Sequence, residues 1–263
     1  MSRLPPFDKY KYYRKAVQAP DTDAEFLYKT YKHLKGRPPK TLREDFCGTF
    51  AISCEWVKQK PGLRAFGVDL DPEPLAYGRE NYYSKLEPGE QRRLEVLQKN
   101  VLDRGLPRAD IVAVFNFSCY FFKQRQMMLD YFKNAHRTLN PGGLFVIDSF
   151  GGPLCEEPNT DEVKHRGFIY YWDQTYFEPI HRDATFFIHF KRKGERKREK
   201  VFRYDWRMWT LPELRDLMAD AGFRKTHVFW EGSTKSGAGN GEFRRREKGD
   251  DAGAWVAYVI GEK

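Results

Sequence analysis

Leu42-Arg43-Glu44-Asp45-Phe46-Cys47-Gly48-Thr49-Phe50 reads as the end of a short strand, a glycine turn and the start of a helix. A second stretch, Gly67-Val68-Asp69-Leu70-Asp71, ends the next apolar strand. A glycine turn between strand and helix lets the backbone approach a ligand, and an acidic residue about 20 positions later can bind ribose hydroxyls. Gly48 and Asp69 have this spacing, which fits a nucleoside-containing cofactor.

The segments around these two stretches alternate between strands and helices. Strands are predicted at 41–46, 65–70, 94–98, 110–117 and 144–149, and helices at 22–35, at 51–60, after Asp71-Pro72 and at 123–139. Thr22-Asp23-Ala24-Glu25 has the form of a capping box for the first helix, and Asn140-Pro141-Gly142-Gly143 ends the last. This alternation predicts βαβ units, a mainly parallel doubly wound sheet and a ligand site at the carboxyl ends of its strands.

The pattern changes after Phe150. Aromatic residues alternate along 167–177, 184–191 and 201–207, which predicts antiparallel strands, and a second capping box at 210–213 opens a helix that ends at Gly222. Strands at 224–231 and 254–260 follow, joined by a charged loop over 232–253. We predict an α/β fold with a seven-stranded, Rossmann-like sheet and an antiparallel insertion after the fifth strand. Its parts are a helical cap over 1–40, a cofactor-binding core over 41–150, an insertion or lid over 151–209, and a closing helix and strands over 210–263.

Composition is consistent with one domain that carries an insertion. The chain has 263 residues, of which 40% are hydrophobic and 16% aromatic. No apolar run is long enough to cross a membrane and the polar start contains no signal-peptide core, so we expect a cytoplasmic protein. The four cysteines, Cys47, Cys54, Cys119 and Cys155, lack metal-binding spacing, which predicts free thiols and no metal site.

Over residues 40–150 the order of motifs resembles that of the class I S-adenosylmethionine-dependent methyltransferases. Their first motif is an acidic residue followed by Gly-x-Gly-x-Gly, and they carry a Pro-Gly-Gly turn like the one at 141–143. The resemblance implies S-adenosyl-L-methionine as cofactor and methyl transfer as activity. It places Glu44 at the acidic position, Cys47-Gly48-Thr49 beside the methionine portion, Asp69 with Leu70 at the ribose, Asn100-Val101 at the adenine, and Asn116 with Phe117 near the sulfonium.

The main departure from the family is that Phe46 and Phe50 occupy positions where glycine is usual. The turn then either avoids positive φ at these residues or follows a different path. Simpler roles also exist for the acidic residues: Glu44 and Asp45 can cap the next helix or pair with Arg43, and Asp69 can be a turn residue. Asn100 can likewise be a simple strand-end residue. An α/β domain with an altered pocket is the corresponding alternative.

The insertion contributes aromatic clusters at 170–174 and 204–209 that can wall a substrate pocket or pack a small sheet. A general base is needed only if the methyl acceptor must lose a proton. The candidates are Tyr120, His165, Tyr171, Asp173 and His189.

Three functions remain open from the sequence. A small-molecule acceptor is favoured by the cofactor motifs and the aromatic insertion. The net charge of +9 supports RNA as the acceptor instead, although the excess is spread out and Asn116 is not followed by the Pro-Pro-aromatic pattern of many nucleobase and protein-amide methyltransferases. A nicotinamide-dependent or non-catalytic nucleotide-binding protein is a third alternative, but the turn has only one glycine of the three that a dinucleotide needs. The sequence contains no feature that predicts the oligomeric state.

Overall fold

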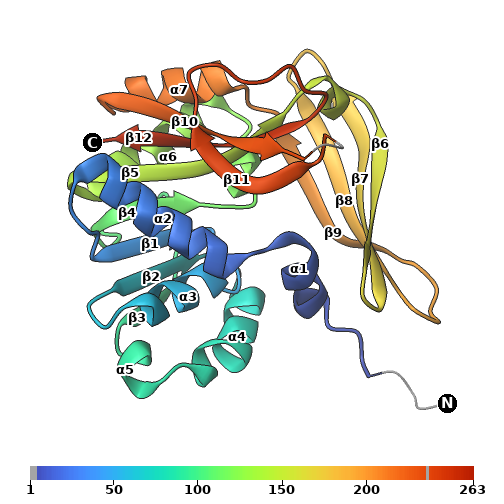
Figure 1. The fold of residues 1–263 in the computed structure, drawn as a ribbon, viewed down its shortest axis with the longest axis horizontal. Helices are drawn as coiled ribbons and strands as arrows, with labels where there is room; N and C mark the ends of the chain where they lie inside the picture. Colours follow the sequence, from blue (N-terminus) through green and yellow to red (C-terminus); the bar gives the residue numbers. More distant parts are fainter. Residues whose placement is uncertain (1–4, 235–236) are drawn as a thin grey trace.

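The computed structural model describes residues 5–234 and 237–263, which form two β-sheets with flanking helices (Figure 1). The larger sheet has eight strands in the order β11-β10-β12-β5-β4-β1-β2-β3, and the smaller has four in the order β6-β7-β8-β9. The strands are β1 Thr41–Asp45, β2 Arg64–Asp69, β3 Leu94–Gln98, β4 Ala109–Val114, β5 Leu139–Gly151, β6 Asn159–His165, β7 Phe168–Glu178, β8 Asp183–Arg192, β9 Arg198–Arg207, β10 Lys225–Ser233, β11 Gly239–Arg245 and β12 Trp255–Glu262. The α-helices are α1 Lys9–Val17, α2 Pro20–Lys35, α3 Ala51–Gln59, α4 Pro72–Asn81, α5 Pro88–Gln91, α6 Arg125–Thr138 and α7 Leu211–Asp220.

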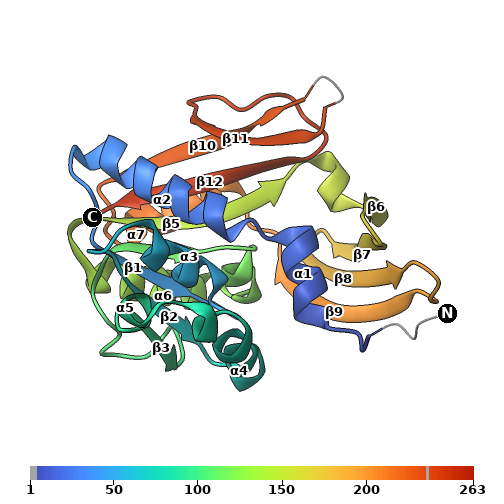
Figure 2. The same cartoon turned by 60° about the horizontal axis from the view of Figure 1, so that its bottom comes forward.

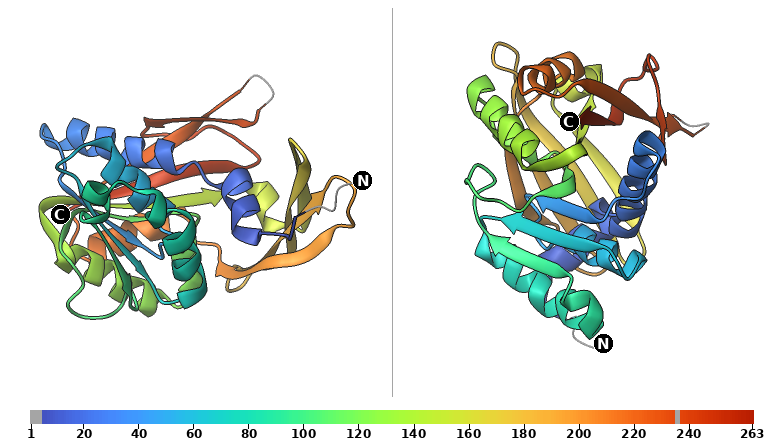
Figure 3. Two further views of the ribbon diagram at one scale, coloured as in Figure 1. Left: turned by 90° about the horizontal axis from the view of Figure 1, so that it is seen from below. Right: turned by 90° about the vertical axis from the view of Figure 1, so that its left-hand side faces the viewer.

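The larger sheet confirms the predicted doubly wound α/β fold. Strands β3, β2, β1, β4 and β5 are parallel, and β12, β10 and β11 add antiparallel strands at one side. Strand β1 lies between β2 and β4, so the chain order reverses there and the carboxyl ends of β1 and β4 border a crevice. Helices α2 and α3 cover one face of this sheet, and α6 and α7 cover the other (Figure 3).

Strand β11 is the difference from the expected seven-stranded sheet, because it forms inside the segment predicted as a loop. It pairs antiparallel with β10, with Glu231 opposite Phe243. The Phe243 ring packs 4.3 Å from that of Tyr258, centroid to centroid. One aromatic residue in an otherwise polar, glycine-rich segment gives no period-two pattern, so the sequence did not predict this strand.

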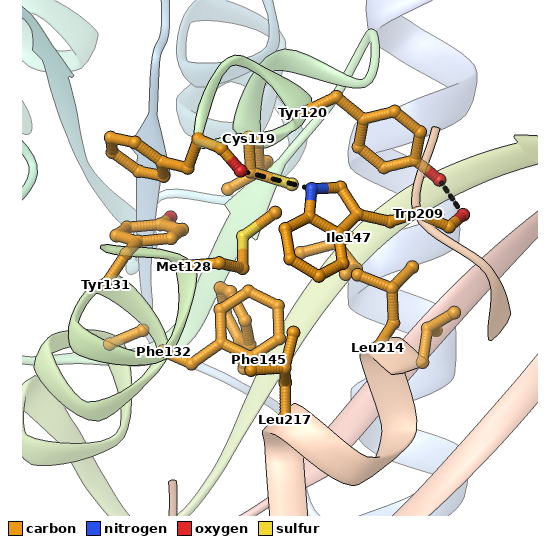
Figure 4. Packing of buried hydrophobic residues seen from close by; sticks show 14 of the residues in the cluster. Cys119, Tyr120, Met128, Tyr131, Phe132, Phe145, Ile147, Trp209, Leu214 and Leu217 are labelled. Carbon is orange, nitrogen blue, oxygen red and sulfur yellow. Dashed lines mark hydrogen bonds between the residues drawn. The ribbon is translucent and has the colours of Figure 1, made fainter. Parts of the chain in front are cut away.

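The core beneath α6 and α7 is largely aromatic (Figure 4). Trp209 is buried there, and its indole Nε1 donates a hydrogen bond to the Phe122 carbonyl at 3.1 Å. Tyr120 donates to the Trp209 carbonyl at 3.3 Å and is 2.6 Å from the Ser149 hydroxyl. These bonds tie the segment after β4 to the segment that leads into α7.

The smaller sheet contains the predicted antiparallel strands and one more, β6. Six of the seven β6 residues are polar and most of the strand is exposed, so its sequence has no apolar face to reveal it. A turn around Gly194 joins β8 to β9. The second predicted capping box is confirmed, since Thr210 and Glu213 exchange hydrogen bonds at the start of α7.

The N-terminal region differs more from expectation. The predicted capping box at 22–25 is wrong: α2 begins at Pro20, and its N-cap Ala19 supplies no side-chain bond. Asp23 instead accepts a hydrogen bond from the Tyr258 hydroxyl at 3.1 Å. Helix α1, capped by Asp8, was not predicted. In Figure 2 it lies between the helices of the larger sheet and the strands of the smaller sheet.

The four cysteines are free, as predicted. Within residues 5–234 and 237–263, no cluster of His, Cys, Asp and Glu is arranged to hold a metal ion. Over the same ranges, none of the helices has the length and apolar character needed to span a membrane.

Candidate active site

The turn after β1 keeps a glycine-like backbone although it contains two phenylalanines. Phe46, Gly48 and Phe50 have φ values of 55°, 52° and 45°. Left-handed backbone costs a residue with a side chain roughly 1–2 kcal/mol, so both phenylalanines need compensating contacts. The alternative that the turn avoids positive φ at Phe46 and Phe50 is therefore wrong.

Packing explains how Phe50 holds this conformation. Its side chain is completely buried. Two glycines give it room: a Cβ on Gly78 of α4 would lie 2.5 Å from the Phe50 ring and 2.4 Å from the Thr49 carbonyl, and one on Gly67 of β2 would lie 3.2 Å from the Phe50 Cβ. The aromatic ring thus fills a space that small neighbours leave open under the turn.

Asp69 closes the other side of the turn. Its Oδ2 accepts the Gly48 N–H at 2.7 Å, and its Oδ1 accepts the Asp71 N–H at 2.9 Å. Burial raises the pKa of this carboxyl, and the backbone bonds oppose that rise. Because each carboxylate oxygen has a second lone pair, both can still accept a ligand hydroxyl. The carboxylate lies at the mouth of the crevice, directly beside the glycine.

The two preceding carboxylates, Glu44 and Asp45, have separate structural partners. Glu44 Oε2 accepts the backbone N–H of Ser53 at 2.8 Å and its hydroxyl at 2.5 Å, so it caps α3 from outside the helix. Burial raises the pKa of Glu44 to about 8. Asp45 forms a two-pronged pair with Arg43 at 2.8 and 2.9 Å, and it also accepts the Tyr131 hydroxyl at 2.9 Å. Capping and pairing therefore both occur, and both carboxylates also border the cavity.

A cavity of about 660 Å³ opens at the ends of β1, β2 and β4, a size typical of small-ligand sites. Its lining residues are Tyr10, Tyr13, Gln18, Glu44, Asp45, Phe46, Cys47, Gly48, Thr49, Asp69, Leu70, Asp71, Pro74, Phe115, Asn116, Ser118, Phe121, Phe202, Tyr204 and Trp206. They come from the larger sheet, from β9 of the smaller sheet and from α1. The Phe46 ring borders this space without filling it.

The turn after β4 is held from behind by a buried carboxyl. Asn116 and Phe117 both have φ of 57°, and Asp148 Oδ1 accepts the Phe117 N–H at 2.8 Å. Burial raises the pKa of Asp148 to about 8. Asn116 borders the cavity, whereas the Phe117 ring packs 4.4 Å from that of Phe150.

Comparison with known proteins identifies the domain. Residues 45–147 match the sequence model of a methyltransferase domain family. Residues 45–147 therefore carry a methyltransferase domain, and the chain has the fold of S-adenosylmethionine-dependent methyltransferases. No curated protein sequence matches the chain.

Three solved structures share the fold over nearly their whole length. The CcbJ methyltransferase from Streptomyces caelestis is 17% identical, with a TM-score of 0.68 over 93% of this chain and 96% of that one. An amino pentose methyltransferase of calicheamicin biosynthesis from Micromonospora echinaspora, with bound S-adenosylmethionine, is 17% identical, with a TM-score of 0.66 over 98% and 99%. A sugar N-methyltransferase from Streptoalloteichus sp. is 19% identical, with a TM-score of 0.65 over 100% and 95%.

Most of the cofactor-site residues predicted for this methyltransferase border the cavity, but three do not. Asn100 lies in the turn after β3, where its side-chain oxygen accepts the Leu102 N–H at 2.9 Å. Val101 is buried in the core, and its carbonyl accepts a bond from Asn134 at 2.7 Å. Phe117 is the third. The Asn100 side chain is thus bonded within the turn that follows β3.

The five candidate bases also lie away from the cavity lining. Tyr120 is buried against Ser149 and Trp209, as described above. The other four belong to the smaller sheet. His189 accepts the Lys200 N–H at its Nδ1, so its Nε2 carries the proton and donates to Asp173 at 3.0 Å. His165 stacks on Phe168, and Tyr171 lies under the Lys197 ammonium.

The structure adds lining residues that the sequence reasoning missed. Tyr10, Tyr13 and Gln18 belong to α1 or follow it, and Phe202 lies on β9. The sequence does contain a pattern that predicts α1. Asp8 is a suitable N-cap, and apolar or aromatic residues recur at a spacing of three or four from Tyr10 to Val17.

Proposed function

We propose that this methyltransferase transfers a methyl group from S-adenosylmethionine to an amine nitrogen of a small molecule. One observation supports the acceptor class most directly. Among the cavity-lining residues that the structure describes, none is Lys, Arg or His, although the chain has a net charge of +9. Acidic and aromatic residues make up more than half of the lining, and this combination attracts an amine in its protonated form and repels a phosphate-rich acceptor.

The cofactor has a matching place at the β1–β2 end of the cavity. We assign Asp69 to the ribose hydroxyls, the Cys47–Thr49 backbone to the methionine portion and the exposed Leu70 to the adenosyl group. Leu70 is 62% exposed beside the partly buried Asp69 carboxylate, as expected for an apolar contact surface. When bound, S-adenosylmethionine supplies a methyl group activated by the positive sulfonium.

The acceptor then occupies the part of the cavity between β4 and β9. Asn116 and Ser118 orient its polar groups, while Phe121 and Trp206 exclude water around the acceptor nitrogen. The amine releases its proton to solvent before the reaction, and its free electron pair then attacks the methyl carbon while S-adenosylhomocysteine leaves. Burial raises the pKa of Tyr13 to about 12, with smaller influences from Tyr204 and Asp148. At neutral pH this hydroxyl stays protonated and serves as a hydrogen-bonding group, not as a base.

Similar structures support the amine. One is described as an amino pentose methyltransferase, one as a sugar N-methyltransferase and another as a glycopeptide N-methyltransferase. RNA is the less favoured acceptor, because phosphate recognition depends on Lys and Arg contacts that the described lining lacks.

The test is release of S-adenosylhomocysteine from S-adenosylmethionine in the presence of three acceptor sets: amino sugars, the corresponding hydroxy sugars and an RNA oligonucleotide. We expect turnover with members of the amine set only, and none with the Asp69→Ala variant. Methylation of the RNA, or equal turnover of matched amino and hydroxy sugars, would contradict the proposed acceptor class. Mass spectrometry of the product locates the methyl group.

A further inference from the structure

Helix α1 is attached to both sides of the cofactor cavity. It lies between the helices of the larger sheet and strand β9 (Figures 1 and 2). On the β9 side, the Tyr13 ring is 5.0 Å from the Phe202 ring, and Tyr12, Ala16 and Val17 join the same apolar cluster. The helix therefore has a broad apolar attachment on one side only.

On the other side, two polar contacts join the first turn of α1 to α4, and farther along α1 the Arg14 side chain lies 3.3 Å from Glu55 of α3 and 4.4 Å from the Tyr82 ring. The Tyr77 hydroxyl donates to Asp8 Oδ2 at 2.8 Å, and the Lys9 ammonium lies 2.7 Å from Glu73 Oε1. Helix α4 begins at Pro72, immediately after the Asp69 segment that we assign to the ribose. We call these contacts the α1–α4 latch; they join the first turn of α1 to the ribose end of the cavity.

Tyr10 occupies the position between the latch and the cavity. Its ring is 4.8 Å from that of Tyr77, and its side chain borders the same cavity as Asp69 and Leu70. Burial raises the pKa of Tyr10, and the carboxylates of Glu73, Asp71 and Asp69 raise it further, so its hydroxyl stays protonated and can donate a hydrogen bond.

We propose that α1 is a strap that retains the cofactor: Tyr10 contacts the adenosyl group beside Asp69, and the α1–α4 latch sets the rate of cofactor release. This inference rests on the cofactor position given under the proposed function. With the cofactor between Asp69 and the inner face of α1, the adenosyl group leaves only when the first turn of α1 moves away from α4.

The two attachments differ in strength, which determines which one opens. The Lys9 and Glu73 side chains are 34% and 62% exposed, so their ion pair is weak and screened by salt. The apolar contacts with β9 bury aromatic rings and depend little on salt. The strap thus opens at α4 while remaining attached to β9.

Binding and release of S-adenosylhomocysteine by the full chain test the strap. Calorimetry gives affinity, and stopped-flow fluorescence gives the dissociation rate. We expect Tyr10→Ala to weaken binding by at least about fivefold, because a ring that stacks on a nucleobase contributes on that scale or more, and Tyr10→Phe to retain most of the affinity. Lys9→Met should raise the dissociation rate and reduce its dependence on salt.

Lys15→Met is the matched control. Lys15 is an exposed residue of the same helix and has no ion pair within the described ranges, so its replacement should change neither rate nor affinity. Hydrogen exchange of the wild-type chain should also slow in α1 when S-adenosylhomocysteine binds, a readout that requires no variant to fold. Wild-type affinity in Tyr10→Ala, equal effects of the two lysine variants, or unchanged exchange in α1 would overturn the strap. Failure of the wild type to bind S-adenosylhomocysteine would instead overturn the proposed cofactor site.

Discussion

Replacing Phe50 with glycine restores the residue that the methyltransferase family usually has at this position, yet we expect it to destabilise this protein. Removing a buried phenylalanine side chain costs about 3–5 kcal/mol, and relief of the left-handed backbone at φ 45° returns roughly 1–2 kcal/mol. The expected net loss is about 1–4 kcal/mol in the free energy of unfolding. Gly67 and Gly78 have no side chains with which to fill the space left by the ring.

Urea unfolding followed by circular dichroism measures this loss as a lower midpoint at an unchanged slope. Phe46→Gly is the matched control, because Phe46 also has positive φ but is only partly buried and borders the cavity. We expect its cost to be less than half that of Phe50→Gly. If Phe50→Gly is as stable as the wild type, the packing explanation for the turn is wrong and backbone strain dominates.

Three further predictions concern the polar groups around the cavity. Asp69→Ala should weaken S-adenosylhomocysteine binding about 10- to 100-fold in calorimetry, because this is the range for losing hydrogen bonds to a charged group. An unchanged affinity would show that the ribose binds elsewhere. Because burial raises the pKa of Asp148 to about 8, the folded state binds a proton that the unfolded state releases near pH 4. The free energy of unfolding should therefore fall as pH rises from about 4 to 8, and Asp148→Asn should reduce that slope in urea titrations; an identical slope in the variant would count against the raised pKa. Arg43→Met should lower the free energy of unfolding by about 3–5 kcal/mol, since it leaves the Asp45 carboxylate buried without its cation, and a loss below 1 kcal/mol in the same assay would argue against an ionised Asp45.

Strong local patterns made the α/β core predictable. Strands β1 to β4 were found close to their observed bounds, because each is a short segment between glycine, proline or helix-capping signals. Strand β5 begins at Leu139, five residues before the predicted start, so the Asn140–Gly143 segment predicted as a turn belongs to the strand. The capping box at Thr210 was correct for the same reason. The segment at Thr22 has the same capping-box pattern, but the helix begins earlier, at Pro20. Asp23 in that segment instead accepts a hydrogen bond from the distant Tyr258. A local sequence motif does not show that a tertiary hydrogen bond will replace the capping bond.

The candidate site was predictable on its larger-sheet side only. Spacing brought Gly48 and Asp69 together as expected, because parallel strands place their carboxyl ends at one edge. The contribution of α1 depends on long-range packing against β9 and α4, which no local pattern encodes. His189 on β8 and Asp173 on β7 lie on neighbouring strands, with His189 opposite Tyr171, and only this strand pairing shows that the two side chains bond to each other and lie outside the cavity lining.

The packing of Phe50 against Gly67 and Gly78 has an evolutionary consequence. A chain with phenylalanine at position 50 cannot accept even a methyl group at position 78 without displacing the Thr49 carbonyl or the ring. Homologues that carry glycine at position 50 are released from part of this restriction and should tolerate larger residues on the facing strand and helix. Substitutions at these three positions are therefore expected to covary across an alignment, with the phenylalanine and the two glycines inherited as a unit.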